Sequence, residues 1–124
     1  MALSNRVNIR GGGEVEPQYT SEGLNASTYS ATIIDGGYYI KSGVCHVDVT
    51  FSISEPKSTS ARTITGFPPA STAGASPNYF IGQAFDGFQM SQNPNNSYAE
   101  LLASQSRSVG TYRFTGSYNT NIQP

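Results

Sequence analysis

Charged residues, cysteine, histidine and tryptophan are all scarce in this chain of 124 residues. Charged side chains make up 12% of the chain, against roughly 25% in a typical soluble domain. Seven Lys and Arg against eight Asp and Glu leave a net charge of −1. So few cations predict no nucleic-acid binding, because phosphate neutralisation requires clustered basic residues. The single cysteine excludes a disulfide framework, and the single histidine excludes a paired-His metal site.

Long hydrophobic runs are missing as well. No apolar segment approaches the roughly 18–20 residues of a membrane span, so we expect no membrane insertion. The first residues lack the apolar stretch of a secretory signal. Hydroxyl groups are abundant instead, from 17 serines and 11 threonines, together with 13 glycines and 8 tyrosines. Low charge with many Ser, Thr, Gly and Tyr indicates an all-β protein with long polar loops.

The clearest periodic segment spans residues 44–54, where apolar and polar residues alternate strictly. One face would carry Cys45, Val47, Val49, Phe51 and Ile53, and the other His46, Asp48, Thr50 and Ser52. This alternation predicts a half-buried strand. Residues 37–41 form a second candidate strand, and the Ser42-Gly43 turn predicts a hairpin between the two. On the apolar face, Cys45 is expected to be a buried free thiol, which is typical of a reducing cytoplasm.

Further strands and turns follow along the chain. Short strands are expected at 30–34, 63–67, 79–85, 88–90 and 109–118, with turns at 35–37 and 86–87, while 98–103 is either a short helix or a strand. Seven or eight short strands predict an antiparallel β-sandwich, jelly-roll-like, over residues 30–124. Residues 1–29, with a glycine run and a proline, form either a disordered leader or an attachment arm ordered by a partner.

No group of residues indicates catalysis. His46 precedes Asp48 on the polar strand face, and a His–Asp pair can orient a base for a serine. At this spacing on an exposed strand, however, such residues are usually ordinary surface side chains. The chain has no Gly-x-Ser-x-Gly motif, and its eight acidic residues are scattered rather than paired as glycoside hydrolysis requires. We therefore expect no enzymatic activity, no cofactor and no metal.

Aromatic and amide side chains near the expected loops suggest a binding surface. Sugars stack an apolar face on aromatic rings, while amides and carboxylates bond the hydroxyls. The candidate saccharide-binding residues are Tyr79, Asp86, Phe88, Asn95, Asn96 and Tyr98. The alternative is that these rings pack against the edge of the sandwich. The Tyr38-Tyr39 pair is expected to place one ring on each sheet face, the outer one available for subunit contact.

Three segments in this order resemble a known family. They are YYIKSGVCHV at 38–47, TITGFPP at 63–69 and YRFTGSY at 112–118. The hairpin, the strand that ends at proline and the final Gly-x-Tyr strand resemble the C-terminal head domains of tailed-phage tail-fibre and receptor-binding proteins. Phe-Pro-Pro departs from the commoner Leu-Pro of that family, and the resemblance covers about residues 37–118.

This resemblance implies a non-enzymatic β-sandwich head, usually a homotrimer, that binds host-surface saccharide. It implies a virion protein of a tail fibre or baseplate, assembled in the host cytoplasm, with residues 1–29 available to contact other virion proteins. One alternative is a structural virion protein (a decoration, head-fibre or connector subunit) that binds capsid or tail proteins. Another is a bacterial carbohydrate-binding module.

Overall fold

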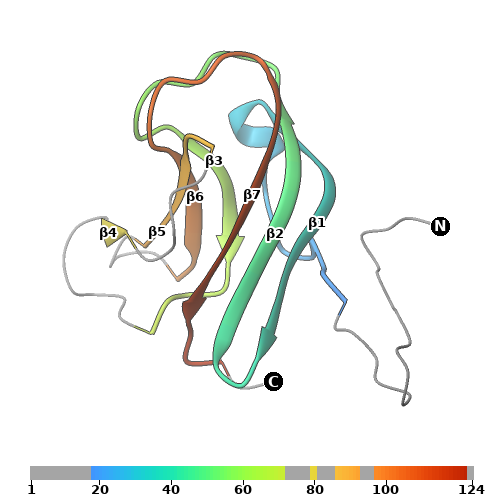
Figure 1. The fold of residues 1–124 in the computed structure, drawn as a ribbon, viewed down its shortest axis with the longest axis vertical. Helices are drawn as coiled ribbons and strands as arrows, with labels where there is room; N and C mark the ends of the chain where they lie inside the picture. The colour runs from blue at the N-terminus through green and yellow to red at the C-terminus, as the bar shows by residue number, and fades with distance from the viewer. Residues whose placement is uncertain (1–17, 72–78, 81–85, 93–96, 123–124) are drawn as a thin grey trace.

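Two antiparallel β-sheets pack face to face in a computed structural model that describes residues 18–71, 79–80, 86–92 and 97–122 (Figure 1). The strands are β1 (Ala31–Lys41), β2 (Val44–Ile53), β3 (Arg62–Phe67), β4 (Tyr79–Phe80), β5 (Phe88–Gln92), β6 (Ala99–Ala103) and β7 (Gly110–Asn119). One sheet has the order β1-β2-β7 and the other β3-β6-β5-β4. The predicted all-β sandwich is confirmed.

The strand count differs from the expected seven or eight short strands. Within the described ranges there are six strands of five or more residues, and β4 contains only two. The main reason lies in β1, where the expected strands at 30–34 and 37–41 are one continuous strand of eleven residues. The hairpin at Ser42-Gly43 is confirmed, since Lys41 pairs with Val44.

The core lies between the two sheets and follows the predicted alternation. Burial alternates along all of β2, and Cys45, Val49 and Phe51 are each fully buried. The ring of Phe51 meets Phe88 of the opposite sheet edge to face, with centroids 5.0 Å apart. Burying one such phenylalanine contributes roughly 1.5–3 kcal/mol, so these contacts hold the sheets together.

The Asp35-Gly36-Gly37 sequence forms a bulge rather than the expected turn. Ile33 pairs with Phe51 and Asp35 with Thr50, so Ile34 is the extra residue. Gly36 and Gly37 have φ angles of +81° and +147°. A Cβ atom on Gly36 would lie 2.0 Å from the carbonyl oxygen of Asp48. The positive φ values therefore bend a continuous strand instead of ending it.

Residues 18–29, expected in the arm, belong to the sandwich. Thr20 and Tyr38 exchange two backbone hydrogen bonds of 2.9 Å, so this segment pairs with the free side of β1. Five residues later, Asn25 and Thr65 exchange two more of 2.9 Å at β3. A short 3-10 turn, η2 (Ser27–Tyr29), then leads into β1. This segment links the edges of the two sheets, while residues 1–17 lie outside the described ranges.

Residues 98–103 contribute a strand, the second of the two alternatives. β6 lies between β3 and β5, and all five of its residues are buried. Pairing on both sides satisfies its backbone groups, which a helix of this length could not achieve alone. Among the described residues, no helix is long and apolar enough to cross a membrane.

Gly37→Ala tests the close approach that shapes β1. A Cβ atom there would lie 1.9 Å from the backbone oxygen of Thr20, at a φ that side chains rarely adopt. We expect the free energy of unfolding to fall by at least about 3 kcal/mol, as measured by urea denaturation.

Gly23→Ala is the matched control, because Gly23 also has a positive φ (+85°) but nothing lies within 4 Å of the added carbon. Only the conformational cost of about 1–2 kcal/mol is expected there. Equal losses for the two variants would show that the contact with Thr20 does not matter.

Candidate functional site

The outer face of the β1-β2-β7 sheet is rich in neutral hydroxyl groups. The strand register places Thr32, Thr50, Ser52, Thr111, Thr115 and Ser117 on this face, opposite to the core residues. The charged side chains among them include Asp48 on β2 and Arg113 on β7, which bind each other. Little charge must therefore be desolvated when a neutral partner covers this face.

A row of aromatic rings crosses one end of this face. Tyr39 of β1 stacks on His46 of β2, with centroids 4.7 Å apart and planes 18° apart. Tyr19, which precedes the paired Thr20, meets Tyr39 edge to face at 4.9 Å. Each ring is thus held by its neighbour. The prediction that Tyr38 and Tyr39 lie on opposite faces is confirmed, because Tyr38 packs against the core.

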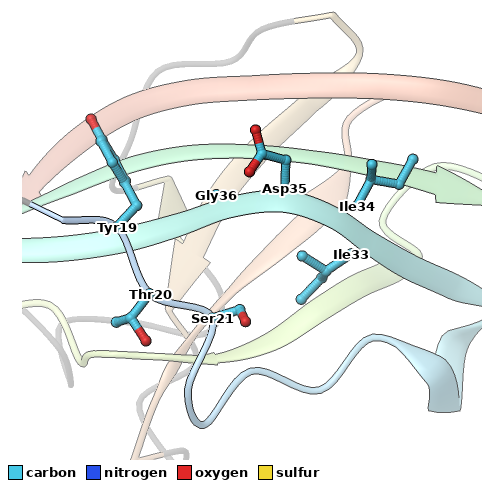
Figure 2. A pocket seen from close by; sticks show the side chains of 7 residues that line it. All are labelled: Tyr19, Thr20, Ser21, Ile33, Ile34, Asp35 and Gly36. Atoms are coloured by element: carbon cyan, nitrogen blue, oxygen red, sulfur yellow. The ribbon is translucent and has the colours of Figure 1, made fainter. Parts of the chain in front are cut away.

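A pocket of about 220 Å³ lies beside this row, where the bulge of β1 meets the segment that pairs with β1 through Thr20 (Figure 2). Its lining consists of Tyr19, Thr20, Ser21, Ile33, Ile34, Asp35 and Gly36. In Figure 2 the Tyr19 ring and the Asp35 carboxylate project to the same side of β1, and Ile33 projects to the other. The side chains of Thr20 and Ser21 lie on the side of Ile33 in this view. The part of the pocket that opens on the outer face therefore carries the Tyr19 ring, the Asp35 carboxylate and Ile34.

A salt bridge on the sheet neutralises charge near this pocket. The guanidinium of Arg113 donates to Asp48 through Nε at 2.9 Å and Nη2 at 2.8 Å. These hydrogen bonds and the charge of Asp48 raise the pKa of Arg113, and Tyr19 and Asp35 add smaller contributions. Arg113 therefore stays protonated, and its positive charge extends to the side of the pocket that carries Asp35.

Phe88, proposed from sequence as a saccharide contact, is fully buried, so this prediction is wrong. Its ring lies in the core, edge to face with Phe51 at 5.0 Å and with Tyr112 at 5.1 Å. The ring faces inward because Phe88 pairs with Ala103 on the core side of the second sheet. It cannot stack on a sugar.

The remaining predicted residues do not form one cluster in the structure. Asp86 is exposed in the turn before β5, with its carboxylate 3.8 Å from Arg107. Tyr98 is half-buried just before β6, whose first residue pairs with Gln92 at the far end of β5. Tyr79 of β4 also pairs with Gln92, and Asn95 and Asn96 lie outside the described ranges. Asp86 is thus separated from Tyr98 by the length of β5.

Sequence reasoning missed Tyr19 and Asp35. Tyr19 fell within the expected arm, and Asp35 was explained by a turn. The alternation in β1 and β2 does place Tyr39 beside His46 once the hairpin register is known. No local signal links Tyr19 to that pair, because the contact depends on the pairing of Thr20 with Tyr38.

A second pocket, of about 280 Å³, lies on the other sheet and is lined by Tyr29, Ser60, Arg62, Glu100 and Leu102. Arg62 Nε lies 3.1 Å from Glu100 Oε1, and the charge of Glu100 raises the pKa of Arg62. The Glu100 side chain has no exposed surface. The first pocket is the candidate site because its carboxylate, Asp35, is partly exposed, whereas that of Glu100 is buried beside Arg62.

The single cysteine is not an activated nucleophile. Burial raises the pKa of the Cys45 thiol to about 11, so it stays protonated at neutral pH. The described ranges contain no group of three or more His, Cys, Asp or Glu that could hold a metal ion. The ring and carboxylate of the first pocket can stack on a ligand and form hydrogen bonds with it.

Cys45 provides a test of the buried core at high pH. Its thiol ionises near 9 when the chain is unfolded and near 11 when folded, so the folded state holds the proton longer. The free energy of unfolding should stay unaffected by this group below pH 9 and fall by roughly 2–3 kcal/mol between pH 9 and 11. The raised pKa values of Tyr38 and Tyr118 act in the same direction.

The thiol reaction with a disulfide reagent at pH 8 gives a direct measurement. We expect the native chain to react at least about 100-fold more slowly than the urea-unfolded chain. Equal rates would contradict the burial of Cys45.

Comparison with known proteins finds no relative of this chain. No protein-family model matches it. Searches of curated proteins and of solved structures also return no match. The fold and the pocket are therefore interpreted from the chain's own residues.

Proposed function

We propose that this chain is a non-enzymatic saccharide-binding domain, and that the pocket beside the β1 bulge holds one sugar unit. The observation that carries this proposal is a tyrosine ring held by Tyr39 and a carboxylate that project to the same side of β1 at a pocket of about 220 Å³. The binding position differs from the loop surface expected from sequence. It lies where the outer face of the first sheet meets the segment at Tyr19.

Two parts of the pocket have a role in binding a sugar. The apolar face of the sugar packs against the Tyr19 ring, while the Asp35 carboxylate accepts hydrogen bonds from its hydroxyl groups. Thr20 and Ser21 line the other side of the pocket, where the Thr20 hydroxyl accepts a hydrogen bond from the N–H of Glu22 at 3.0 Å, so the main sugar contacts are assigned to Tyr19 and Asp35. Tyr19 is held by Tyr39, so little side-chain entropy is lost when the ligand binds.

The biological setting of the proposal comes from the resemblance to phage head domains. In that setting the domain is part of a tail fibre or baseplate and binds a host-surface glycan. Of the expected arm, residues 1–29, the part available to contact other virion proteins is residues 1–17, because residues 18–29 belong to the sandwich. A structural virion protein and a bacterial carbohydrate-binding module remain the alternatives. The first binds protein partners instead of a glycan, and the second binds a glycan as a monomer.

A glycan array with the purified chain tests the proposal. We expect specific binding, weakened at least about tenfold by Asp35→Asn, because a hydrogen bond to a charged group contributes roughly 1.5–3 kcal/mol. Tyr19→Ala should weaken it similarly by removing the stacking surface. Thermal unfolding of each variant separates lost binding from lost fold.

Tyr98→Ala is the matched control, because Tyr98 is a half-buried tyrosine outside this pocket. It should leave binding unchanged. Loss of binding with Tyr98→Ala alone would instead favour the loop surface predicted from sequence. Absence of any glycan binding, together with capture by capsid or tail proteins, would favour the structural alternative.

A further inference from the structure

All ten residues of strand β7 pair with β2 on one side, and on the other side the described residues bond its backbone only at the last residue, Asn119. The sheet order is β1-β2-β7, so β2 covers one side of β7 and no described strand covers the other (Figure 1). An edge of this length presents a row of backbone donors and acceptors to a further strand.

Two hydrogen bonds identify which residues of β7 present those groups. The N–H of Thr120 donates to Gly43 at 2.8 Å, on the β2 side, whereas the carbonyl of Asn119 accepts from Ser71 at 2.9 Å on the other side. Backbone direction alternates along an antiparallel strand. The residues whose backbone groups point away from β2 are therefore Thr111, Arg113, Thr115 and Ser117. No hydrogen bond joins these groups to another described residue on that side.

This edge lacks the features that usually prevent strands from pairing. The register of β7 with β2 is unbroken over ten pairs, so no bulge bends it. It contains no proline, and its one charged residue, Arg113, is neutralised by Asp48. The opposite edge is different, because β1 carries a bulge at Ile34 and pairs with Thr20 at Tyr38, within the strand, whereas Ser71 contacts β7 only at its last residue.

We propose that the β7 edge pairs antiparallel with the same edge of a second copy of this chain. The register that pairs Thr111 with Ser117 and Arg113 with Thr115 of the second copy uses all four outward-pointing residues. Both copies then contribute to one six-stranded sheet. Because this two-fold contact uses the β7 edge of both copies, the assembly is complete at two copies. A longer assembly would require the β7 edge of one copy to pair with the β1 edge of the next, which Thr20 partly covers.

The antiparallel orientation lets the outward groups of the two edges bond each other. In this register residue 111 of one copy lies beside residue 117 of the other, so the paired stretch ends before Asn119, whose outward carbonyl accepts from Ser71. The pairing therefore leaves the contact between Ser71 and Asn119 intact.

The pairing has a consequence for ligand binding, which rests on the proposed function. A two-fold axis perpendicular to the sheet keeps both outer faces on the same side. With neighbouring strands about 4.8 Å apart, the two β1 strands lie about 24 Å apart across the six-stranded sheet. Two saccharide pockets would then face one surface together, which strengthens binding to a repeated glycan without any new contact.

Sedimentation equilibrium of the full chain tests the pairing without any ligand. We expect a mass of twice 13.2 kDa in a concentration series up to about 100 µM, a range that detects weak interfaces. Thr115→Pro removes an outward N–H and no hydrogen bond within the sheet. It should raise the dimer dissociation constant at least about tenfold.

Ser117→Lys gives a second variant in case the proline disturbs the fold, because a lysine on the edge opposes pairing without entering the core. Ser52→Lys is its matched control: it adds the same charge on the same face, but on the central strand β2. The control should remain a dimer.

Three results would overturn the proposal. They are a monomer throughout the concentration series, the trimer mass expected from the phage resemblance, and a dimer that neither edge variant weakens. Each of them is independent of glycan binding, so failure of this pairing and failure of the proposed function are distinguished.

Discussion

Two backbone contacts that leave no space for a Cβ atom determine how β1 is shaped. Gly36 lies against the carbonyl of Asp48 on β2. Gly37 lies against the carbonyl of Thr20, in the segment before β1. The contact at Gly36 lies directly after the bulge. The contact at Gly37 lets the backbone of Thr20 come close enough to pair with Tyr38. Because Tyr19 and Asp35 are neighbours of these positions, the candidate pocket exists only where the two contacts occur.

The parts of the fold that were predicted correctly are those set by local alternation. In β2 burial alternates from one residue to the next, so the positions of Cys45 and Phe51 in the core needed no knowledge of other segments. The bulge was missed for a physical reason. Asp-Gly-Gly favours positive φ in a turn and in a bulge alike, and only the pairing of Ile33 with Phe51 and Asp35 with Thr50 distinguishes them.

The candidate site was less predictable than the fold, since its residues meet through long-range pairing. Tyr19 and Tyr39 are twenty positions apart in sequence, and their contact depends on the backbone pairing of Thr20 with Tyr38. Phe88 shows the opposite error. An aromatic residue directly after an Asp-Gly turn resembles a loop residue, yet as the first residue of β5 its ring points to the core. Neighbouring residues of a strand point to opposite faces of the sheet, so a shift of one position decides whether a ring faces solvent or the core.

On the outer sheet face, Arg113 and Asp48 neutralise each other. Arg113 is the only charged residue of β7, and left unpaired it would repel its counterpart in a second copy. Bound in two hydrogen bonds to Asp48, it leaves the edge close to neutral. The same pair keeps a cation close to Asp35, which limits the net negative charge at the pocket. One salt bridge thus bears on both proposals, because it lowers the net charge at the β7 edge and beside the candidate pocket.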